Sequence, residues 1–412
     1  MNEKLASKNI PSNISLERVK WPLRRLSEVI SIHYGKSLIE QKRIDGNIPI
    51  YGTNGITGWH NAALAYGPSI IIGRVGAGPL GVFWCEGPFW VIDCGYYTTF
   101  NYSEINAKFL YYFLKYTGVN HLKDGTSKPT LNRNLLGQQY FPNPPLLTQR
   151  KIAAILSAYD DLIENNLRRI KILEEMAQNL YTEWFVKFRF PGHEKVKMVD
   201  SPLGRIPEGW KITKLSNLVE TQYGYTQSAS ETEIGPKFVR GMDINKTSYI
   251  DWSSVPYCTI ADTDINRYRL KVEDILIIRM ADPGKVGIVE KPINAIFASY
   301  LIRLHIVSPQ LSPYYLFYFL CSDYYQGYIT GASTGTTRKS ASAGVITDVG
   351  TLVPDGESVK EFGRHVSSYR SMLNNLLNQN TILRHLRDLL LPRLISGELD
   401  VSGLDIRMGN DE

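Results

Sequence analysis

The chain has few cysteines and no long apolar run, and these two scarcities exclude several classes of protein. Its 412 residues contain 4 cysteines, Cys85, Cys94, Cys258 and Cys321, none of them in the Cys-x-x-Cys spacing of zinc or redox motifs. We therefore expect reduced core cysteines in a cytoplasmic protein. The N-terminus lacks the apolar run of a signal peptide. No apolar stretch reaches the roughly 18 residues that a membrane-spanning helix needs.

Motifs for catalysis and for cofactor binding are also missing. No P-loop occurs, and no cluster of His, Cys, Asp and Glu has metal-ligand spacing. Gly76–Gly81 fits the glycine pattern of dinucleotide-binding loops, but Pro79 and the Val-Phe-Trp that follows favour a turn and a strand. Asn143–Leu146 resembles the Asn-Pro-Pro-aromatic motif of adenine methyltransferases without its aromatic residue, so we interpret it as the lead-in to a helix. The sequence predicts a non-catalytic chain with no cofactor and no metal.

Composition and charge place the chain among globular proteins. Apolar residues make up 43% of it and charged residues 21%, and its length fits two domains or more. The formal net charge is +6, and the first 148 residues, with 15 basic and 9 acidic side chains, hold that whole excess. A basic balance favours acidic partners such as nucleic acid without proving them.

An internal repeat organises the sequence. Trp21, Leu26, Ser27, Tyr34 and Gly35 recur 189 residues later as Trp210, Leu215, Ser216, Tyr223 and Gly224. Towards the end of each copy the offset is 210, so that Ser157, Asn165, Ile172 and Leu180 correspond to Ser367, Asn375, Ile382 and Leu390. The growing offset indicates small insertions in the loops of the second copy.

Each copy begins with about 140 residues of mixed pattern. Residues 69–72 and 274–278 look like buried strands, whereas 109–116 and 314–320 look like short helices or buried strands. Each copy then ends in a long apolar-striped segment that predicts a helix.

The two predicted helices carry heptad stripes. The first helix has apolar residues at heptad positions a, d and e, and the second has them at a and d. The residues at position d include Leu162 and Met176 in the first helix and Met372 and Leu386 in the second. Helices this long, with a continuous apolar stripe, are not stable alone in water, so we expect them to pack on each other. Because each helix must return to its own domain, we expect the pair to be antiparallel. Asn166 falls on an a position, where it either fixes the register or is a tolerated polar residue. We expect Pro191-Gly192 to end the first helical region, and Pro392 and Gly397 to end the second helix.

The expected fold class is therefore α+β. Two similar globular domains are separated by two long helices packed as an antiparallel coiled coil, with a pseudo-two-fold internal repeat.

Four stretches of this sequence strongly resemble the specificity subunit of type I DNA restriction-modification systems, an HsdS-like chain. They are residues 183–194 (EWFVKFRFPGHE), 204–210 (GRIPEGW), 389–400 (LLLPRLISGELD) and 124–132 (DGTSKPTLN). With the duplicated architecture, the resemblance covers nearly the whole chain. The sequence departs from the expected pattern at Ala341–Gly344, which is smaller and looser than expected and puts the backbone path of that loop in doubt.

The resemblance implies a division of the chain into functional segments. Residues 1–148 and 209–356 would be target recognition domains 1 and 2, residues 149–190 and 357–397 the coiled-coil spacer helices, 191–208 a polar linker and 398–412 a tail. The chain would read a bipartite site on double-stranded DNA and dock two methyltransferase subunits, with motor-nuclease subunits joining that core. Methyl transfer and ATP-dependent cleavage would take place in those partners. Two readers held apart by helices should read two half-sites with an unread spacer.

Candidate DNA-reading residues were selected as loop cations, amides, hydroxyls and aromatic side chains, because cations bind phosphates while amides, hydroxyls and Arg forks read base edges. For Arg74 and Arg279, which follow buried strands, a structural ion pair is an equal alternative. In the first domain the candidates are Tyr51, Thr53, Asn54, Trp59, His60, Arg74, Lys123, Thr126, Ser127, Lys128, Asn132 and Arg133. In the second they are Tyr223, Tyr225, Thr226, Arg240, Arg279, Thr334, Thr336, Thr337, Arg338, Lys339 and Ser340.

The sequence leaves two other functional classes to compare with this hypothesis. A coiled-coil scaffold or interaction protein would hold partners without reading DNA, but it predicts no basic loops repeated in both copies. A fused restriction-methylation enzyme would need motifs and length that the chain lacks. Retardation of random duplex DNA, with and without a methyltransferase partner, separates the first alternative from a DNA reader.

Overall fold

The computed structural model describes residues 20–125, 129–335 and 339–406 of the chain. Two compact units divide it: unit 1 comprises residues 1–164 and 382–412, and unit 2 comprises residues 165–381. Each unit contains one segment of each of two long helices, α4 (Leu146–Tyr181) and α9 (Gly356–Ser396).

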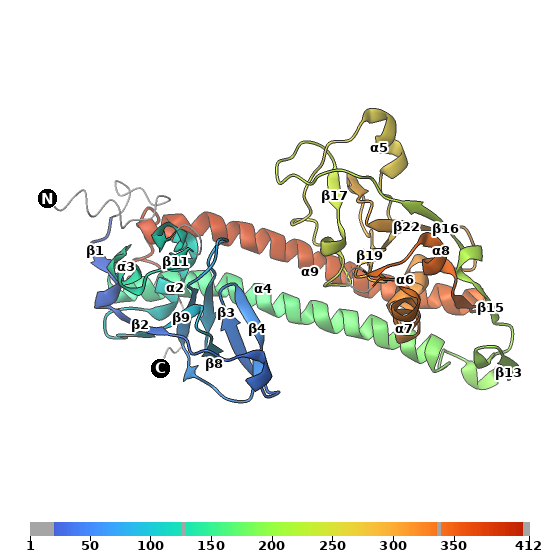
Figure 1. Cartoon of the computed structure of the whole chain (residues 1–412), viewed down its shortest axis with the longest axis horizontal. Coiled ribbons are helices and arrows are strands. Elements are labelled where there is room, and N and C mark those ends of the chain that lie inside the picture. The colour runs from blue at the N-terminus through green and yellow to red at the C-terminus, as the bar shows by residue number, and fades with distance from the viewer. Residues whose placement is uncertain (1–19, 126–128, 336–338, 407–412) are drawn as a thin grey trace. The chain divides into compact units, whose positions relative to one another are not determined.

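Unit 1 is built around a four-stranded sheet, in which strands pair in the order β2-β9-β6-β7. A second sheet has the order β4-β3-β8-β5, and short ladders join β1 to β12 and β10 to β11. Helix α2 lies against β6 and β7 (Figure 1). The elements are β1 Leu23–Arg25, η3 Leu26–Glu28, β2 Ile30–Tyr34, η4 Glu40–Lys42, β3 Ile48–Gly52, β4 Gly55–His60, β5 Ala65–Tyr66, β6 Ser69–Gly73, β7 Val82–Cys85, β8 Pro88–Val91, β9 Gly95–Phe100, α2 Ala107–Thr117, η5 Asn120–Leu122, β10 Lys123–Asp124, β11 Thr130–Leu131, α3 Arg133–Gln138 and β12 Tyr140–Pro142.

Unit 2 contains a four-stranded sheet of the order β16-β22-β18-β20. Two-stranded ladders join β13 to β14, β15 to β24, β17 to β21 and β19 to β23. The elements are η6 Thr182–Val186, η7 His193–Lys195, β13 Met198–Ser201, β14 Gly204–Pro207, β15 Lys211–Lys214, η8 Leu215–Asn217, β16 Val219–Tyr223, β17 Lys237–Val239, η9 Gly241–Asp243, α5 Asp262–Tyr268, β18 Ile275–Ile278, β19 Met280–Ala281, β20 Val286–Ile288, β21 Ala295–Phe297, β22 Leu301–Ile306, α6 Pro313–Cys321, α7 Asp323–Ala332, β23 Lys339–Ser340, α8 Ala343–Thr347 and β24 Gly350–Val353.

The two units repeat one topology, as the sequence repeat predicts. The sheet β2-β9-β6-β7 corresponds strand for strand to β16-β22-β18-β20, and the ladder β1–β12 corresponds to β15–β24. Each unit also has one parallel pair, β3 with β8 and β17 with β21. The predicted buried strands are β6 and β18, and the two segments that were ambiguous between helix and strand are α2 and α6.

Segments of α4 and α9 pair antiparallel within each unit. In unit 1, the Asp160 carboxylate accepts a hydrogen bond from Arg387 at 2.5 Å, and Ile152 shares a core cluster with Leu394. In unit 2, Ile170 packs with Leu373, and the rings of Tyr181 and Phe362 lie 6.1 Å apart. Residue numbers rise on one helix as they fall on the other, so the expected antiparallel coiled coil is confirmed.

The side chains that are buried between the two helices are not all those that the heptad pattern predicts. In α4, residues 152, 156, 163, 166, 170 and 177 are buried, at spacings of three, four and seven. In α9, residues 362, 366, 373, 376, 380, 391 and 394 are buried at the same spacings, except for a gap of eleven between 380 and 391. The residues that we assigned to d lie outside this buried seam, with exposed fractions of 55% for Leu162, 43% for Met176, 54% for Met372 and 42% for Leu386. The apolar stripe is wider than one helix-helix contact can cover, and the d row is its uncovered flank.

A buried amide pair lies in this seam. Asn166 Nδ2 donates to Asn380 Oδ1 at 2.9 Å, and both side chains are buried between the helices. Shifting either helix by one turn would place an apolar residue against an unpaired amide, which costs about 1–3 kcal/mol. Of the two interpretations of Asn166, the structure favours register fixing.

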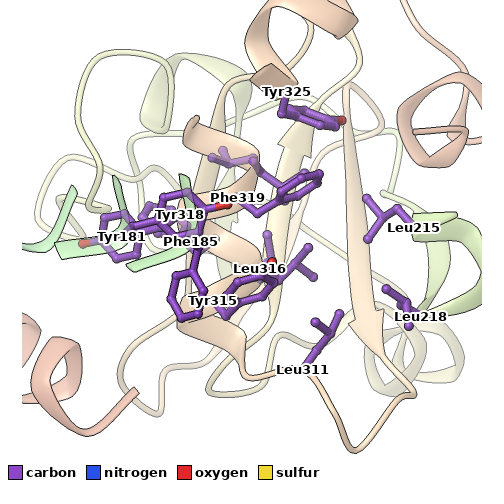
Figure 2. Packing of buried hydrophobic residues seen from close by; sticks show 14 of the residues in the cluster. Tyr181, Phe185, Leu215, Leu218, Leu311, Tyr315, Leu316, Tyr318, Phe319 and Tyr325 are labelled. Carbon is purple, nitrogen blue, oxygen red and sulfur yellow. The ribbon is translucent and has the colours of Figure 1, made fainter. Parts of the chain in front are cut away.

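The core of unit 2 is rich in aromatic rings. Figure 2 shows Tyr181 and Phe185 gathered against Tyr315 and Tyr318 of α6. The ring centroids of Phe185 and Tyr315 are 4.8 Å apart, at an interplanar angle of 84°. These edge-to-face contacts tie the end of α4 to the core of unit 2.

The connecting segments differ from expectation in two places. The predicted polar linker 191–208 contains the hairpin β13–β14, and Ile206 within it is buried in the unit 2 core. Pro392 does not end the second helix, since α9 continues through it to Ser396. Gly397, with φ of 79°, supplies the left-handed conformation that ends the helix. Near the helix end a proline removes one backbone hydrogen bond, which the packing of Leu394 and Ile395 offsets.

The cysteines were expected in the core; Cys85 and Cys258 are buried, whereas Cys94 and Cys321 are only partly buried. All four are free. Burial raises the pKa of Cys258 to about 11 and that of Cys321 to about 12. Both thiols are therefore protonated and unreactive near neutral pH.

A buried charge network attaches the globular part of unit 2 to both helices. Arg370 of α9 is 1% exposed, and its Nε and NH2 donate to the two oxygens of Glu290 at 2.7 and 2.6 Å. It also donates to Ser248 O at 3.0 Å, and the Ser248 N–H donates to Glu174 of α4 at 3.2 Å. Burial alone would lower the pKa of Arg370, but the hydrogen bonds and charge of Glu290 raise it above its ordinary value.

We predict that Arg370→Met lowers the free energy of unfolding of unit 2 by about 3–5 kcal/mol, because it leaves the buried Glu290 carboxylate without a counter-charge. Arg364→Met is the matched control, since Arg364 lies on the same helix with an exposed side chain and should cost no more than about 0.5 kcal/mol. Urea unfolding followed through the aromatic core of unit 2 measures both. Equal midpoints for the two variants would contradict the role of the network.

Candidate nucleic-acid interface

In unit 1, two arginines stack on one exposed tyrosine. Tyr34 is the last residue of β2, and Arg74 directly follows β6. The guanidinium carbon of Arg74 lies 5.3 Å from the centroid of the Tyr34 ring, and that of Arg133 lies 5.0 Å from it. Arg74 NH1 also donates to Asp93 O at 3.1 Å, while its Nε is buried without a partner. The stack holds two planar, permanently charged forks at one edge of the sheet.

Unit 2 has the same arrangement at the equivalent positions. Tyr223 ends β16 and is exposed, and the guanidinium carbon of Arg279, which follows β18, lies 5.0 Å from its ring centroid. The third position differs, because the N–H of Ala343 donates to the Tyr223 hydroxyl at 3.1 Å where unit 1 has Arg133. Among the residues that the structure describes, no carboxylate pairs with Arg74 or Arg279, so the ion-pair alternative is not what holds them.

The strands that flank the two predicted basic loops lie next to Arg74 and Arg279. In unit 1, the N–H of Leu131 donates to Arg74 O at 2.7 Å; in unit 2, the N–H of Ala341 donates to Arg279 O at 2.9 Å. Six candidates lie outside the described residues: Thr126, Ser127, Lys128, Thr336, Thr337 and Arg338. Their flanking strands nevertheless fix where both loops start and end, next to the arginine–tyrosine stacks.

The described flanks of the second loop carry three further candidates. Thr334 and Ser340 exchange two backbone hydrogen bonds, of 3.0 and 2.8 Å. Lys339 is exposed and lies in register with Ala281 across the β19–β23 ladder. Lys339 is therefore an exposed cation on the strand that pairs with β19, which directly follows Arg279.

The segment from Tyr51 to His60 forms the hairpin β3–β4. Of its five candidate residues, some are buried or hydrogen-bonded within the unit and others are exposed. Tyr51 and His60 are buried, and the His60 ring nitrogen accepts from the N–H of Ile44 at 3.0 Å. Thr53 Oγ1 donates to Val75 O at 2.9 Å. Asn54 and Trp59 are exposed and accessible to a partner.

Two other candidates in unit 1 have structural partners. Lys123 Nζ donates to the carbonyl oxygens of Gly76, Ala77 and Gly78 at 3.3, 3.3 and 3.0 Å, which closes the glycine-rich turn before β7. Asn132 caps α3, its side chain accepting from the N–H of Asn134 at 2.8 Å. Its capping places Arg133 at the first helical position, over Tyr34.

In unit 2 a cavity of about 550 Å³ brings three candidates together. Tyr225 and Thr226 line it from the loop after β16, and Arg240 lines it from the start of η9. The guanidinium of Arg240 is occupied by Asp243, to whose carboxylate Nε and NH2 donate at 3.1 and 3.0 Å. This pairing neutralises the charge of Arg240.

Sequence reasoning missed several residues of this interface. Tyr34 was overlooked although the repeat matches it to Tyr223, so the signal was available in the sequence. The cavity also involves Met242, Ser299 and Tyr300, whose turns follow buried strands but carry no motif. Their exposure depends on how the turns pack against one another, which no local pattern encodes.

Within residues 20–125, 129–335 and 339–406, no group of three or more His, Cys, Asp and Glu is placed to hold a metal ion. None of the helices in the same described ranges is both long and apolar enough to cross a membrane.

Comparison with known proteins relates the chain to one group. Residues 18–175 match the family model described as type I restriction modification DNA specificity domain. The chain is 26% identical over 314 residues to the type I restriction enzyme MjaIX specificity subunit of Methanocaldococcus jannaschii, covering 72% of this chain and 70% of the relative. It is 24% identical over 317 residues to the EcoBI specificity subunit of Escherichia coli, covering 72% and 66%.

One solved structure supports the fold. The S subunit of a type I restriction-modification system from M. genitalium has a TM-score of 0.56 to this chain at 15% identity, covering 94% of this chain and 99% of that one. This likeness confirms the α+β fold with long helices.

We predict that Arg74→Ala and Arg279→Ala each weaken binding to duplex DNA. If a guanidinium contacts phosphate, the loss is uniform across sequences and the salt slope falls by about one. If it reads a guanine, discrimination at one base pair falls by about 1–3 kcal/mol. Arg205→Ala, an exposed arginine on β14, is the control. Retardation assays at several salt concentrations measure these effects, and wild-type behaviour of both variants would refute the assignment.

Proposed function

We propose that the chain is a type I restriction-modification DNA specificity subunit, in which unit 1 and unit 2 each read one half of a bipartite DNA site for partner enzymes. The observation that carries this proposal is the duplicated arginine–tyrosine stack, Arg74 on Tyr34 and Arg279 on Tyr223, each beside a basic loop. A scaffold that held partners without DNA would have no reason to keep half-buried arginines without carboxylate partners among the described residues at equivalent strand ends.

The reading elements proposed for each unit are of two kinds. Arg74, Arg133, Arg279 and Lys339 supply cations for phosphates or for guanine edges, and the loops containing Lys128 and Arg338 extend from the same strand ends. In this proposal residues 1–148 and 209–356 are the recognition domains, and α4 and α9 are the spacer. Methyl transfer and ATP-dependent cleavage are assigned to partner subunits, and the complex would act on DNA in the cytoplasm.

Two equivalent apolar surfaces support docking of two copies of one partner. Unit 1 exposes Leu162, Ile382 and Leu386, and unit 2 exposes Met372, Ile172 and Met176. Members of the two sets lie 210 residues apart, the offset of the helical repeat. Exposed apolar clusters mark interaction sites, and a repeated one fits two methyltransferase subunits. Motor-nuclease subunits would then join this core.

The proposed function is tested by expressing the chain with a methyltransferase and a motor-nuclease partner in a host free of adenine methylation. Base-resolved methylation mapping should show one bipartite motif with an unread spacer. Arg74→Ala should relax or abolish one half of the motif, and Arg279→Ala the other half. Methylation that is unchanged when the chain is omitted would refute the role, and DNA-independent partner assembly alone would favour the scaffold.

We predict that Leu386→Glu and Met176→Glu each reduce the number of methyltransferase subunits bound from two to one, because each places a charge in one apolar surface. His385→Glu is the matched control: His385 is exposed and adjacent in sequence, but points about 100° further round α9. Native mass spectrometry or light scattering gives the stoichiometry. Two subunits bound in both single variants and in the double variant would exclude these surfaces.

A further inference from the structure

The cavity in unit 2 has the wrong shape for reading base edges in a groove. Buried Phe238, Ile278 and Ala298 line its inner wall, while Met242 and Tyr300 are exposed. Base edges lie at the floor of a groove about 8.5 Å deep, so a protein reads them with elements that protrude. A cavity of about 550 Å³ instead receives a group that protrudes from the DNA.

Charge argues against a phosphate as that group. The lining includes one basic residue, Arg240, and Asp243 occupies two of its nitrogen atoms. Asp282, an acidic residue, also lines the cavity and is exposed. An anion would therefore enter without a free counter-charge, whereas an uncharged ring would meet apolar and aromatic walls.

Two cations that lack a carboxylate partner among the described residues are adjacent in sequence or in register to the cavity lining. Arg279 immediately precedes Met280, which lines it, and Lys339 is in register with Ala281, which also lines it. Ala281 has a φ of 73°, a left-handed conformation that a non-glycine residue adopts at a cost in energy and that is frequent at functional sites. Phosphates held by Arg279 and Lys339 would bring the intervening nucleotide to the cavity.

We propose that this cavity binds a nucleobase turned out of the DNA duplex, an inference that rests on the proposed function of unit 2 as a reading domain. Tyr225 and Tyr300 supply rings for stacking on the base. Ser299 supplies a hydroxyl, and Asn245 has a buried side-chain oxygen with no partner among the described residues. These groups suit the polar edge of a base, whereas a phosphate would find no free cation there.

The inference can be tested on the wild-type complex of the chain and its partners by asking whether a base mismatch raises or lowers the affinity for DNA. Duplexes carry one mismatch at a time across the mapped site, excluding the methylated adenines, which the methyltransferase itself extrudes. A mismatch opposite the extruded base removes its pairing cost and should tighten binding by roughly tenfold. A base read in the groove should bind less tightly when mismatched. Tighter binding at one position within or beside the unit 2 half-site is the expected result.

A cavity-filling variant then locates the effect. Gly241→Leu puts a side chain into the cavity, and its Cβ would meet Ile278 at an ordinary 3.5 Å. The variant should lose the mismatch enhancement, and also the rise in fluorescence of 2-aminopurine placed at the same position. Gly327→Leu is the matched control, because a Cβ there meets nothing within 4 Å and lies outside the cavity lining.

The outcomes separate this inference from the proposed function. Sequence-specific binding in which every mismatch weakens affinity overturns the inference alone. Mismatch enhancement that persists in Gly241→Leu also overturns the inference. If Gly241→Leu instead loses partner binding but binds DNA as the wild type does, the inference is again overturned, and the cavity receives a side chain of a partner protein. Absence of any sequence-specific binding overturns the proposed function and the inference with it. If Gly241→Leu does not fold, the wild-type mismatch series decides.

Discussion

The antiparallel pairing of α4 and α9 is the constraint on which both units depend. The core of unit 1 is not complete within one continuous stretch of chain, because Leu391 and Leu394 of α9 are buried in it. Unit 2 is the continuous stretch 165–381, and Tyr181 of α4 and Phe362 of α9 are both buried in its core. Each unit therefore folds around one segment of each long helix. Because the apolar cores supply most of the stabilisation, the helix pair and the reading units fold together.

Polar groups determine which of several similar pairings is adopted. An apolar seam alone would tolerate a slip of one heptad, since leucine and isoleucine side chains are nearly equivalent in each register. The Asn166–Asn380 hydrogen bond makes such a slip costly, and Arg370 joins α9 to Glu290 and Ser248 in the globular part. Buried polar pairs of this kind add less stability than apolar packing would, but they select one geometry. A reading unit needs that geometry, because side chains address bases over distances of a few ångströms.

Duplication gives the two units the same framework, and divergence within that framework makes their surfaces different. Both units place an arginine at the end of a buried strand and stack it on a tyrosine from the neighbouring part of the sheet. Unit 1 then adds Arg133, where unit 2 has the backbone N–H of Ala343. The offset between the copies grows from 189 at Tyr34 to 205 at Arg74, so most of the extra residues of the second copy lie between β16 and β18, a stretch that contains α5.

The sequence by itself determined the repeat, the two long helices, their antiparallel direction and the class of chemistry at the strand ends, because each of these is written in local periodicity or in spacing. It also contained the match of Tyr34 to Tyr223. Tertiary structure decided which heptad positions were buried, leaving Leu162 and Met372 exposed. It gave three DNA-reading candidates, Tyr51, His60 and Lys123, burial or hydrogen-bond partners within unit 1. It also created the cavity beside Arg279 from turns far apart in the chain. Burial and partner choice depend on what packs from elsewhere, and a local pattern carries no record of that.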